Sequence, residues 1–484
     1  MSSGRAIVVG SGPNGLAGAV TLARAGLEVT VYERQDHLGG AAATRELTLP
    51  GFLHDVGSAV HPMAAHSEFF RAFGLGERVE LITPELSYAH ALTPSRAVPA
   101  WRDLERTAKG LGVDASTWRR LLWPLAVDAE RLASVAGGAF LPPPHPVVAL
   151  RLGLRALEQG SGAWNAGFLT DEAAALLTGV IAHTNRRLPA IGAAAPGLVL
   201  AAFAHAGGWP VPRGGSGAIA RALADDLVAH GGRIETGVDV TSLDELDHAD
   251  VVLLDVTPRA FLRLAGERLP GRYRRSLAAF RYGDGVAKVD FALSEPVPWT
   301  APELREAVTI HAGGTRGDIA RAEAEVAAGR LPGHPYLLLS QPSLVDDTRA
   351  PAGKHVLWAY THVPAGSDID RTEAVTAEIE RFAPGFRDTV LASASTSAAE
   401  LESLNPNLVG GDIAAGSTGL RQLLARPAPG PAPWRTPLAG VYLCGGSTAP
   451  GPGVHGQSGW HAARLALGEL RMPVPDLAPS SPQV

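Results

Sequence analysis

The first 33 residues contain the feature that most constrains this fold, a glycine-rich turn between a short apolar run and a longer amphipathic segment. Residues 7–9 are apolar and suit a buried parallel strand. Gly10, Gly12 and Gly15 follow in the pattern G-x-G-x-x-G. In such a unit the first glycine allows a tight turn, the second lets the main chain approach a pyrophosphate, and the third lets the helix pack on the strand. The segment therefore predicts a dinucleotide-binding turn.

The residues after this turn complete the expected unit. Small and apolar side chains recur at helical spacing over residues 14–25, and Gly26 suits the end of that helix. A second strand, predicted over residues 28–32, brings Glu33 to the edge of the sheet, 18 residues after Gly15. A carboxylate there accepts hydrogen bonds from ribose hydroxyls and repels a 2′-phosphate. The acid therefore favours FAD or NAD over NADP.

The order of these elements matters more than the glycines themselves, because a chain with 56 glycines contains such strings by chance. Here strand, turn, helix, strand and acid follow one another, and the diglycine Gly39–Gly40 comes soon after the acid. That arrangement is typical of FAD-binding two-domain flavoproteins, so it favours FAD over NAD.

A second glycine-rich stretch lies more than 400 residues further along, at residues 440–467. Its glycines and prolines permit a stiff turn with close main-chain approach, and a helix predicted from about residue 457 to 470 points its positive end at that turn. Reduced flavin develops negative charge at N1 and O2, which such a helix end stabilises. We expect the two stretches to bind opposite halves of one FAD.

Composition excludes several other classes of protein. A chain of 484 residues that is 46% hydrophobic can form two domains with cores of their own. The net charge is −6 and no dense Lys/Arg cluster is present, so nucleic acid is not an expected partner. The single cysteine, Cys444, excludes a C-x-x-C pair and with it a disulfide reductase. Its apolar surroundings predict a small buried thiol in a strand.

Targeting and membrane signals are weak. No secretory signal precedes the first strand and no run of about 18 apolar residues appears, so a cytoplasmic protein without a spanning helix is expected. The nearest candidate, residues 190–206, is alanine-rich and contains Pro196 and Gly197. It suits a buried core segment. The wall of an apolar substrate tunnel or a shallow membrane-touching surface are the alternatives, so a peripheral membrane contact stays open.

The character of the sequence changes along the chain and predicts an α/β fold. Helical segments over residues 101–110, 116–136 and 170–183 predict an inserted helical layer. From Trp209 the pattern of a nucleotide-binding domain returns, with a helix over 218–230 and strands over 233–236 and 250–254. Residues 272–424 predict an antiparallel sheet with helices. Its strands are expected at 286–293, 335–339 and 355–361, and its helices at 318–328 and 370–382.

Four motifs together resemble the phytoene dehydrogenase-related flavoproteins, the carotenoid-desaturase and carotenoid-isomerase branch of the amine-oxidase-like FAD superfamily. The motifs are the N-terminal turn, PRGGSG (212–217) with its helix, NPNLVGGDI (405–413) and CGGSTAPGPGVHG (444–456). The resemblance covers most of the chain. It is loose in the helical layer and sheet that would contact substrate.

The resemblance implies a Rossmann-like FAD-binding domain with a central parallel sheet and helices, interleaved with a substrate domain of mixed or antiparallel sheet plus helices. Residues 1–66, 205–270 and 425–472 would form the first domain, and residues 67–204 and 271–424 the second. The proline-rich residues 473–484 predict a disordered tail.

The resemblance also implies which residues bind FAD. The glycines of the N-terminal turn and Glu33 would hold the AMP and pyrophosphate half, and the main chain of Val240 would contact adenine. The C-terminal turn would lie near the ribityl chain and the isoalloxazine ring. The predicted cofactor-binding residues are Gly10, Gly12, Pro13, Asn14, Gly15, Glu33, Arg34, Gly39, Gly40, Ala41, Gly57, Ser58, Val240, Gly445, Gly446, Gly453, Val454 and His455.

His455 is the candidate catalytic residue, because it is the one titratable group inside the C-terminal turn. A packing role is the alternative, and related desaturases commonly have proline at the aligned position. Asp55, in the segment HDVG, either braces a loop or takes part in chemistry. Lys288 lies in a strand-like run, and some amine-oxidising relatives place a lysine beside flavin N5.

No metal and no nicotinamide-binding domain are expected. The histidines lack metal-ligand spacing, and the glycines of residues 311–318 lack the G-x-G-x-x-G pattern. The sequence offers no evident catalytic triad or pair of carboxylates. This suits a flavoenzyme, which need only place a C–H bond within about 3 to 3.5 Å of N5 and exclude water.

The main prediction is an FAD-dependent oxidoreductase that desaturates or isomerises a hydrophobic substrate. That substrate would be carotenoid-like, isoprenoid or long-acyl, and reduced FAD would pass electrons to oxygen or a quinone. Two alternatives stay open: an FAD-dependent amine oxidase, and a non-redox lipid or prenyl carrier on the same fold.

Overall fold

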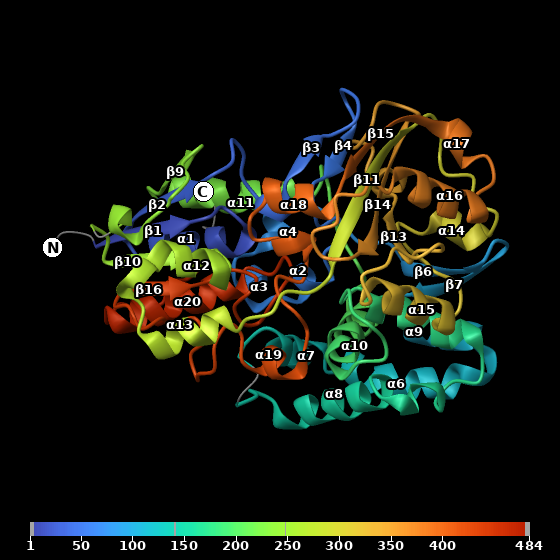
Figure 1. The fold of residues 1–484 in the computed structure, drawn as a ribbon, viewed down its shortest axis with the longest axis horizontal. Helices are drawn as coiled ribbons and strands as arrows, with labels where there is room; N and C mark the ends of the chain where they lie inside the picture. The colour runs from blue at the N-terminus through green and yellow to red at the C-terminus, as the bar shows by residue number, and fades with distance from the viewer. Residues whose placement is uncertain (1–3, 140–141, 247, 480–484) are drawn as a thin grey trace, which may run out of the picture.

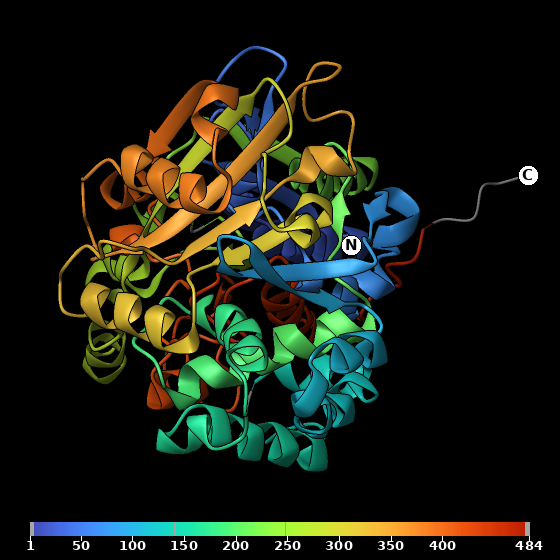
Figure 2. The same ribbon diagram turned by 90° about the vertical axis from the view of Figure 1, so that its right-hand side faces the viewer.

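The computed structural model describes residues 4–139, 142–246 and 248–479, which are built on two large sheets (Figures 1 and 2). The first sheet has the strand order β16-β10-β1-β2-β9, and every neighbouring pair is parallel. Short apolar strands of this kind suit a parallel sheet covered by helices. The strands are β1 (Arg5–Val9), β2 (Glu28–Glu33), β9 (Arg233–Thr236), β10 (Val251–Leu254) and β16 (Val441–Leu443).

The predicted N-terminal unit is present with small shifts at its ends. Helix α1 (Pro13–Arg24) begins immediately after Gly12, and proline at its first position has the backbone angle that a helix start requires. Gly26 follows the helix with a φ of 92°, which suits glycine. The expected strand-turn-helix-strand order is therefore confirmed.

Helices α1 and α20 (Gln457–Glu469), from opposite ends of the sequence, pack against each other. A Cβ atom at Gly459 would lie 1.7 Å from the main-chain oxygen of Asn14 and 2.8 Å from the nitrogen of Gly18. The two helices therefore cross with their main chains in contact. Because β16 pairs with β10, which pairs with β1, the turns that follow β1 and β16 open at the same edge of the sheet.

The second sheet has seven strands in the order β15-β11-β14-β13-β12-β6-β7 and is mixed, because β12 and β6 run parallel. The expectation of an antiparallel sheet drawn from residues 272–424 is therefore incomplete. Two strands come from the stretch interpreted as a helical layer. β6 has nearly every residue buried, so it shows no alternation of polar and apolar residues. The strands are β6 (Leu86–Thr93), β7 (Arg96–Trp101), β11 (Gly285–Leu293), β12 (Thr309–Ala312), β13 (Leu337–Ser340), β14 (His355–Val363) and β15 (Val390–Thr396).

The helical layer lies below both sheets in Figures 1 and 2. Its central helix, α10, is buried and contacts α6, α8 and α9. The membrane-touching interpretation of residues 190–206 is therefore wrong, because this segment is core. None of the described helices is both long enough and apolar enough to cross a membrane. The helices of the layer are α5 (Leu104–Gly110), α6 (Ala115–Ala126), α7 (Ala129–Ala136), α8 (Pro146–Gln159), α9 (Asp171–Ala182) and α10 (Ile191–Ala206).

The remaining elements connect the two sheets or cover their outer faces. The helices are α2 (Pro62–His66), α3 (Glu68–Ala72), α4 (Leu75–Arg78), α11 (Gly217–Ala229), α12 (Pro258–Ala265), α13 (Gly271–Ala278), α14 (Pro302–Glu306), α15 (Arg316–Val326), α16 (Thr372–Phe382), α17 (Phe386–Thr389), α18 (Ala398–Leu404) and α19 (Leu420–Leu424). The short strands are β3 (Thr44–Glu46), β4 (Leu53–Asp55), β5 (Leu81–Ile82) and β8 (Val211–Pro212).

Part of the predicted disordered tail has a defined place. The Arg24 guanidinium donates hydrogen bonds to the carbonyl oxygens of Asp476 and Ala478, and Leu477 is buried. Residues 473–479 therefore lie against the rest of the protein, which corrects the expectation of disorder for them. Residues 480–484 lie outside the described residues.

Gly459→Ala tests the contact between the chain ends. The added Cβ would overlap the Asn14 carbonyl, so the helices must separate, at a cost of about 1 to 3 kcal/mol of unfolding free energy. Gly468→Ala in the same helix is the matched control, since nothing lies within 4 Å of its Cβ position. Thermal unfolding of both variants measures the difference, and equal stability would contradict the contact.

Candidate functional site

The N-terminal turn has the tight geometry that its glycines predict. Gly10 has a φ of 102°, and a Cβ at Gly15 would lie 2.1 Å from the Gly10 carbonyl oxygen. A Cβ at Gly12 would lie 2.6 Å from Oδ2 of Asp255. Gly12 therefore makes room for a carboxyl group of the protein, which the sequence argument about pyrophosphate alone missed.

Glu33 lies at the end of β2 and is buried. Its Oε2 accepts hydrogen bonds from the main-chain nitrogen of Ser11 at 2.9 Å and from Ser11 Oγ at 2.6 Å, and its Oε1 accepts one from the nitrogen of Gln35 at 2.8 Å. These donors fix the carboxylate beside the glycine turn. The Arg34 side chain is exposed, and its Nε lies 3.8 Å from Oδ2 of Asp239.

The turns after β1 and β16, together with Glu33 and the loops at residues 39–41 and 57–58, form a cradle at one edge of the first sheet. Val240 lies towards the Glu33 end of this cradle. The nitrogen of Val238 donates to the carbonyl of Glu33 at 2.9 Å, which draws the loop after β9 against β2. Among the described residues, the main-chain N–H and C=O of Val240 have no hydrogen-bond partner. The loop therefore presents free main-chain groups beside the acid.

The diglycine loop and the segment HDVG lie against the first turn. The nitrogen of Gly39 donates to the carbonyl of Ser11 at 3.1 Å, and a Cβ at Gly40 would lie 3.6 Å from the Cα of Gly12. The nitrogen of Ser58 donates to the carbonyl of Ala41 at 2.9 Å. A Cβ at Gly57 would lie 2.5 Å from that same oxygen. Residues 39–41 and 57–58 therefore form the next layer of the cradle.

The C-terminal turn places Gly453 at the surface of the cradle and buries Val454 and His455. Gly445 and Gly446 follow β16 after Cys444, and a Cβ at Gly446 would lie 3.2 Å from Cβ of Ala415. Gly453 has a φ of 131°, so a side chain there would strain the turn. The turn therefore exposes main chain rather than side chains.

His455 uses both ring nitrogens within its own turn. Its Nδ1 accepts a hydrogen bond from the nitrogen of Gln457 at 3.1 Å, so its Nε2 donates to the carbonyl of Gly451 at 3.1 Å. Burial lowers the pKa of the imidazole to about 4. These contacts favour the packing role of His455, and a catalytic role for it stays a prediction.

Three buried amide oxygens lack a partner among the described residues, and two of them belong to helix N-termini. These two are Oδ1 of Asn14 in α1 and Oε1 of Gln457 in α20, and the third is Oδ1 of Asn185. The N-terminal end of a helix also carries unpaired N–H groups and partial positive charge. The two helix ends that flank the cradle therefore suit an anionic, hydrogen-bonding ligand.

Asp255 is the cradle residue that sequence reasoning missed. It follows β10 directly, and its Oδ2 accepts a hydrogen bond from the nitrogen of Gly15 at 3.1 Å. Burial raises the pKa of this carboxyl to about 7; the Gly15 N–H opposes that shift and the nearby Glu33 adds to it. An acid directly after the apolar run 251–254 was the signal available in the sequence.

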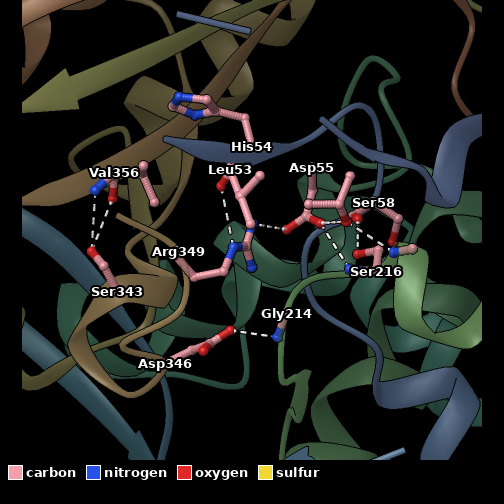
Figure 3. A network of polar contacts seen from close by, with 12 residues as sticks. Leu53, His54, Asp55, Ser58, Gly214, Ser216, Ser343, Asp346, Arg349 and Val356 are labelled. Atoms are coloured by element: carbon pink, nitrogen blue, oxygen red, sulfur yellow. Dashed lines mark hydrogen bonds and ion pairs between the residues drawn. The ribbon is translucent and has the colours of Figure 1, made fainter. Parts of the chain in front are cut away.

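A buried ion pair ties the cradle to the second sheet, as Figure 3 shows. Nη2 of Arg349 donates to Asp55 at 2.7 Å, and both side chains are 1% exposed. Asp55 also accepts hydrogen bonds from Oγ1 of Thr44 and from the nitrogen of Ser216, each at 2.8 Å. Burial alone would raise the pKa of Asp55, but Arg349 and Ser216 outweigh it and hold the pKa below its usual value. The contacts favour the bracing role for Asp55.

The same network joins the PRGGSG loop to the loop before β14. The nitrogen of Gly214 donates to Oδ2 of Asp346 at 2.8 Å, and Oγ of Ser216 donates to the carbonyl of Ser58 at 2.5 Å (Figure 3). Nε of Arg349 donates to the carbonyl of Leu53 at 3.2 Å. Segments of both expected domains are therefore fixed in one polar cluster, although the domain boundaries themselves stay a prediction.

One face of the second sheet carries a row of aromatic and imidazole rings towards the helical layer. Neighbouring ring centroids lie 5.2 to 6.3 Å apart. Lys288 ends the row, with Nζ 5.9 Å from the ring of Trp358 and its ammonium paired with buried Asp290. Burial lowers the pKa of Lys288, and Asp290 opposes that shift. In order, the rings belong to Tyr88, His311, Tyr336, His362, Tyr360 and Trp358.

The histidines considered as metal ligands have other partners. Nε2 of His61 lies 2.7 Å from Oγ of Ser216, and Nε2 of His183 lies 2.7 Å from that of His311. His66 stacks on Phe203, and Nε1 of Trp118 donates a hydrogen bond to Nε2 of His205 at 3.1 Å. Within the described part of the chain, no three His, Cys, Asp or Glu side chains are grouped to hold a metal ion.

Comparison with known proteins agrees with this geometry. Residues 8–73 match the family model described as an NAD(P)-binding Rossmann-like domain. Pyridine nucleotide-disulfide oxidoreductase domain-containing protein 2 of Rattus norvegicus is 28% identical, over 96% of this chain and 94% of its own. Phytoene dehydrogenase of Streptomyces griseus is 28% identical, over 80% of this chain and 77% of its own.

Solved structures show the same architecture. A putrescine oxidase bound to putrescine is 16% identical and superposes with a TM-score of 0.58, covering 97% of this chain and 99% of that chain. The chain therefore has a dinucleotide-binding Rossmann-like domain within the fold of the flavin amine oxidases. The predicted α/β fold class is confirmed, and the resemblance to the amine-oxidase-like superfamily holds at the level of fold.

Arg349→Met tests the buried pair. Removing the guanidinium leaves the Asp55 carboxylate buried without its cation, so we expect a loss of about 3 to 5 kcal/mol in unfolding free energy. The stability contributed by Asp55 is present above its unfolded pKa and is lost as pH falls through the lower folded pKa. Without Arg349, burial raises the pKa of Asp55, so protonation relieves the buried charge and the stability difference from the unaltered protein should shrink as pH falls.

Arg213→Met is the control for that variant, because Arg213 pairs with Asp347 at the surface nearby. Its loss should stay within about 1 kcal/mol. Denaturant titrations of both variants give the comparison, and equal losses would refute the assigned role of the buried pair.

Proposed function

We propose that this protein is an FAD-dependent oxidoreductase that desaturates or isomerises an apolar carotenoid-like, isoprenoid or long-acyl substrate. One observation carries the proposal: the glycine turns from both ends of the chain open at one edge of a parallel sheet, held there by the contact between α1 and α20. This edge of an α/β sheet is where dinucleotides bind.

The residues of the cradle fit FAD. Glu33 suits the ribose hydroxyls, and the free main-chain groups of Val240 suit adenine. The unpaired amide oxygens of Asn14 and Gln457 can accept hydrogen bonds from hydroxyl groups of the coenzyme, and the N–H groups of the same helix ends suit its anionic parts. When bound, FAD supplies the hydride acceptor, the flavin N5.

The protein's own contribution is placement and exclusion of water. The row of rings on the second sheet is buried and offers a flat, polarisable surface to a conjugated substrate. Several polar atoms along the row have no partner among the described residues, including Oη of Tyr88, Nδ1 of His311 and Nε2 of His362. These atoms suit a substrate that combines a conjugated part with an oxygen or nitrogen group.

An amine oxidase is the second candidate. Lys288 lies buried beside Trp358 and Tyr360, which supports a site for an amine near aromatic rings. A non-redox lipid or prenyl carrier is less well supported, because it gives no reason for intact glycine turns at both ends. Disulfide reduction through a C-x-x-C pair is impossible with one cysteine, although a similar protein carries disulfide oxidoreductase in its name.

The substrate experiment separates these candidates. The purified protein should show the visible absorbance of bound flavin, and anaerobic addition of the true substrate should bleach it. We expect bleaching by a polyene or a long acyl thioester, followed by recovery when oxygen or a quinone is admitted. Bleaching by amines alone would replace the desaturase with the amine oxidase, and a colourless protein would favour the carrier.

The proposed substrate also favours a peripheral membrane contact, for which α8 offers a surface. Its exposed side carries Val147, Leu150, Leu154 and Leu157, each at least half exposed. Helices α6 and α8 together contain four arginines, each of which pairs with the carboxylate of Glu105, Asp128 or Glu158. An apolar stripe beside these ion pairs suits the interface of a membrane.

A cavity near this surface supports the same interpretation. It has a volume of about 450 Å³ and is lined by Pro142, Leu423, Leu424 and Ala449, among other residues. Pro142 lies four residues before α8, and Ala449 lies in the C-terminal turn. An apolar substrate leaving a membrane at α8 would meet this cavity before the cradle.

The double variant Leu150→Glu, Leu154→Glu tests the contact. Each leucine withdrawn from lipid should cost about 1.5 kcal/mol or more, so binding to anionic vesicles should fall at least about tenfold in a sedimentation assay. Ile369→Glu, half exposed and outside the helical layer, is the control and should bind normally. Unchanged vesicle binding, or loss of a dimer in gel filtration instead, would contradict the membrane contact.

A further inference from the structure

Asp255 lies where the glycine segments of the cradle converge. Its Oδ2 accepts the hydrogen bond from the nitrogen of Gly15 and lies 2.6 Å from the Cβ position of Gly12. Its Oδ1 lies 3.0 Å from the Cβ position of Gly445, at the start of the C-terminal turn. The carboxyl group therefore borders both halves of the cradle at once.

The charged and titratable groups around Asp255 offer it no cation. From β2, Glu33 faces it, and from the end of β16, Cys444 does. The first turns of α1 and α20 carry no charged side chain. Arg259 of α12 pairs with Glu402 instead, and in the described part of the chain no ion pair includes Asp255.

This arrangement places two carboxyl groups beside the site of a diphosphate. Like charges that share a buried site raise one another's proton affinity. The helix ends supply N–H groups and partial positive charge. Arg426 lies against Gly451 of the C-terminal turn, but its guanidinium donates to the carbonyl oxygens of Ala414 and Ala415, and in the described part of the chain neither carboxylate pairs with a lysine or arginine. One of the two carboxyl groups therefore has to be neutral when the diphosphate is bound.

Resting on the proposed function, we infer that Asp255 binds FAD as a neutral carboxylic acid, so that coenzyme binding above neutral pH takes up a proton. In this form Oδ2 still accepts the Gly15 N–H, and Oδ1 carries the proton and donates it as a hydrogen bond to the coenzyme. Glu33 keeps its charge, because Ser11 and Gln35 donate three hydrogen bonds to it.

The direction of the pH dependence follows from the free protein. Burial raises the pKa of Asp255 to about 7, so the carboxyl is largely protonated below that pH and largely ionised above it. A bound diphosphate raises the pKa further, so ligand binding favours the protonated form. The affinity for FAD is therefore greatest at and below neutral pH and falls as pH rises. The buried thiol of Cys444 has a pKa well above its ordinary value and does not titrate in this range.

The experiment measures FAD affinity of the full-length protein by flavin fluorescence at pH values between about 6 and about 9. We expect a nearly constant Kd up to about pH 7 and then an increase approaching tenfold per pH unit, which corresponds to uptake of one proton. Calorimetry in two buffers of different ionisation enthalpy counts that proton directly. Its result depends on no variant.

Asp255→Asn removes the titrating group and keeps both hydrogen-bonding positions, so its Kd should not change with pH. Glu33→Gln is the matched control: it should weaken binding and keep a pH dependence, which should begin at a lower pH because Glu33 no longer raises the pKa of Asp255. A wild-type Kd that stays constant up to about pH 9, or the same slope in Asp255→Asn, would overturn the inference. Tight FAD binding without proton uptake ends this inference alone, whereas absence of FAD binding at every pH ends the proposed function.

Discussion

The crossing of α1 and α20 holds the two ends of the chain together. A carbonyl oxygen of Asn14 occupies the place where a side chain at residue 459 would begin, so the contact requires glycine. Through it, β16 can lie beside β10, and the turns after β1 and β16 open on one side of the sheet. Without this contact the chain would contain two glycine-rich turns with no common ligand.

The cradle that results relies on helix ends and main-chain groups rather than on basic side chains. Glu33 and Asp255 both lie within it, and their nearest donors are N–H and hydroxyl groups. Such a site binds an anion through oriented dipoles, and each buried acid has to be matched by donors or by a proton. This gives the cradle a pH sensitivity that a site built on lysine or arginine would lack.

The second sheet is fixed to the cradle by the buried cluster around Asp55 and Arg349 (Figure 3). The cluster spans residues almost 300 positions apart in the chain, so it orients the ring-bearing face of the sheet relative to the coenzyme site. The free energy needed to remove two charges from water offsets much of the attraction within a buried ion pair. Removing one partner is strongly destabilising, because the other charge is then left buried alone. We therefore interpret the cluster as a constraint on the geometry between the two sheets.

The sequence by itself determined the N-terminal unit from β1 to Glu33, the last helix and the buried place of Cys444, because these depend on local spacing and apolar pattern. It predicted the α/β class but missed β6, which is buried on both faces and so shows no alternation. Only the tertiary structure revealed Asp255 beside Gly12, the pairing of Arg349 with Asp55 and the exposed apolar side of α8. The reason is physical: local patterns record which residues avoid water, whereas the pairing of buried charges depends on contacts between segments far apart in the chain.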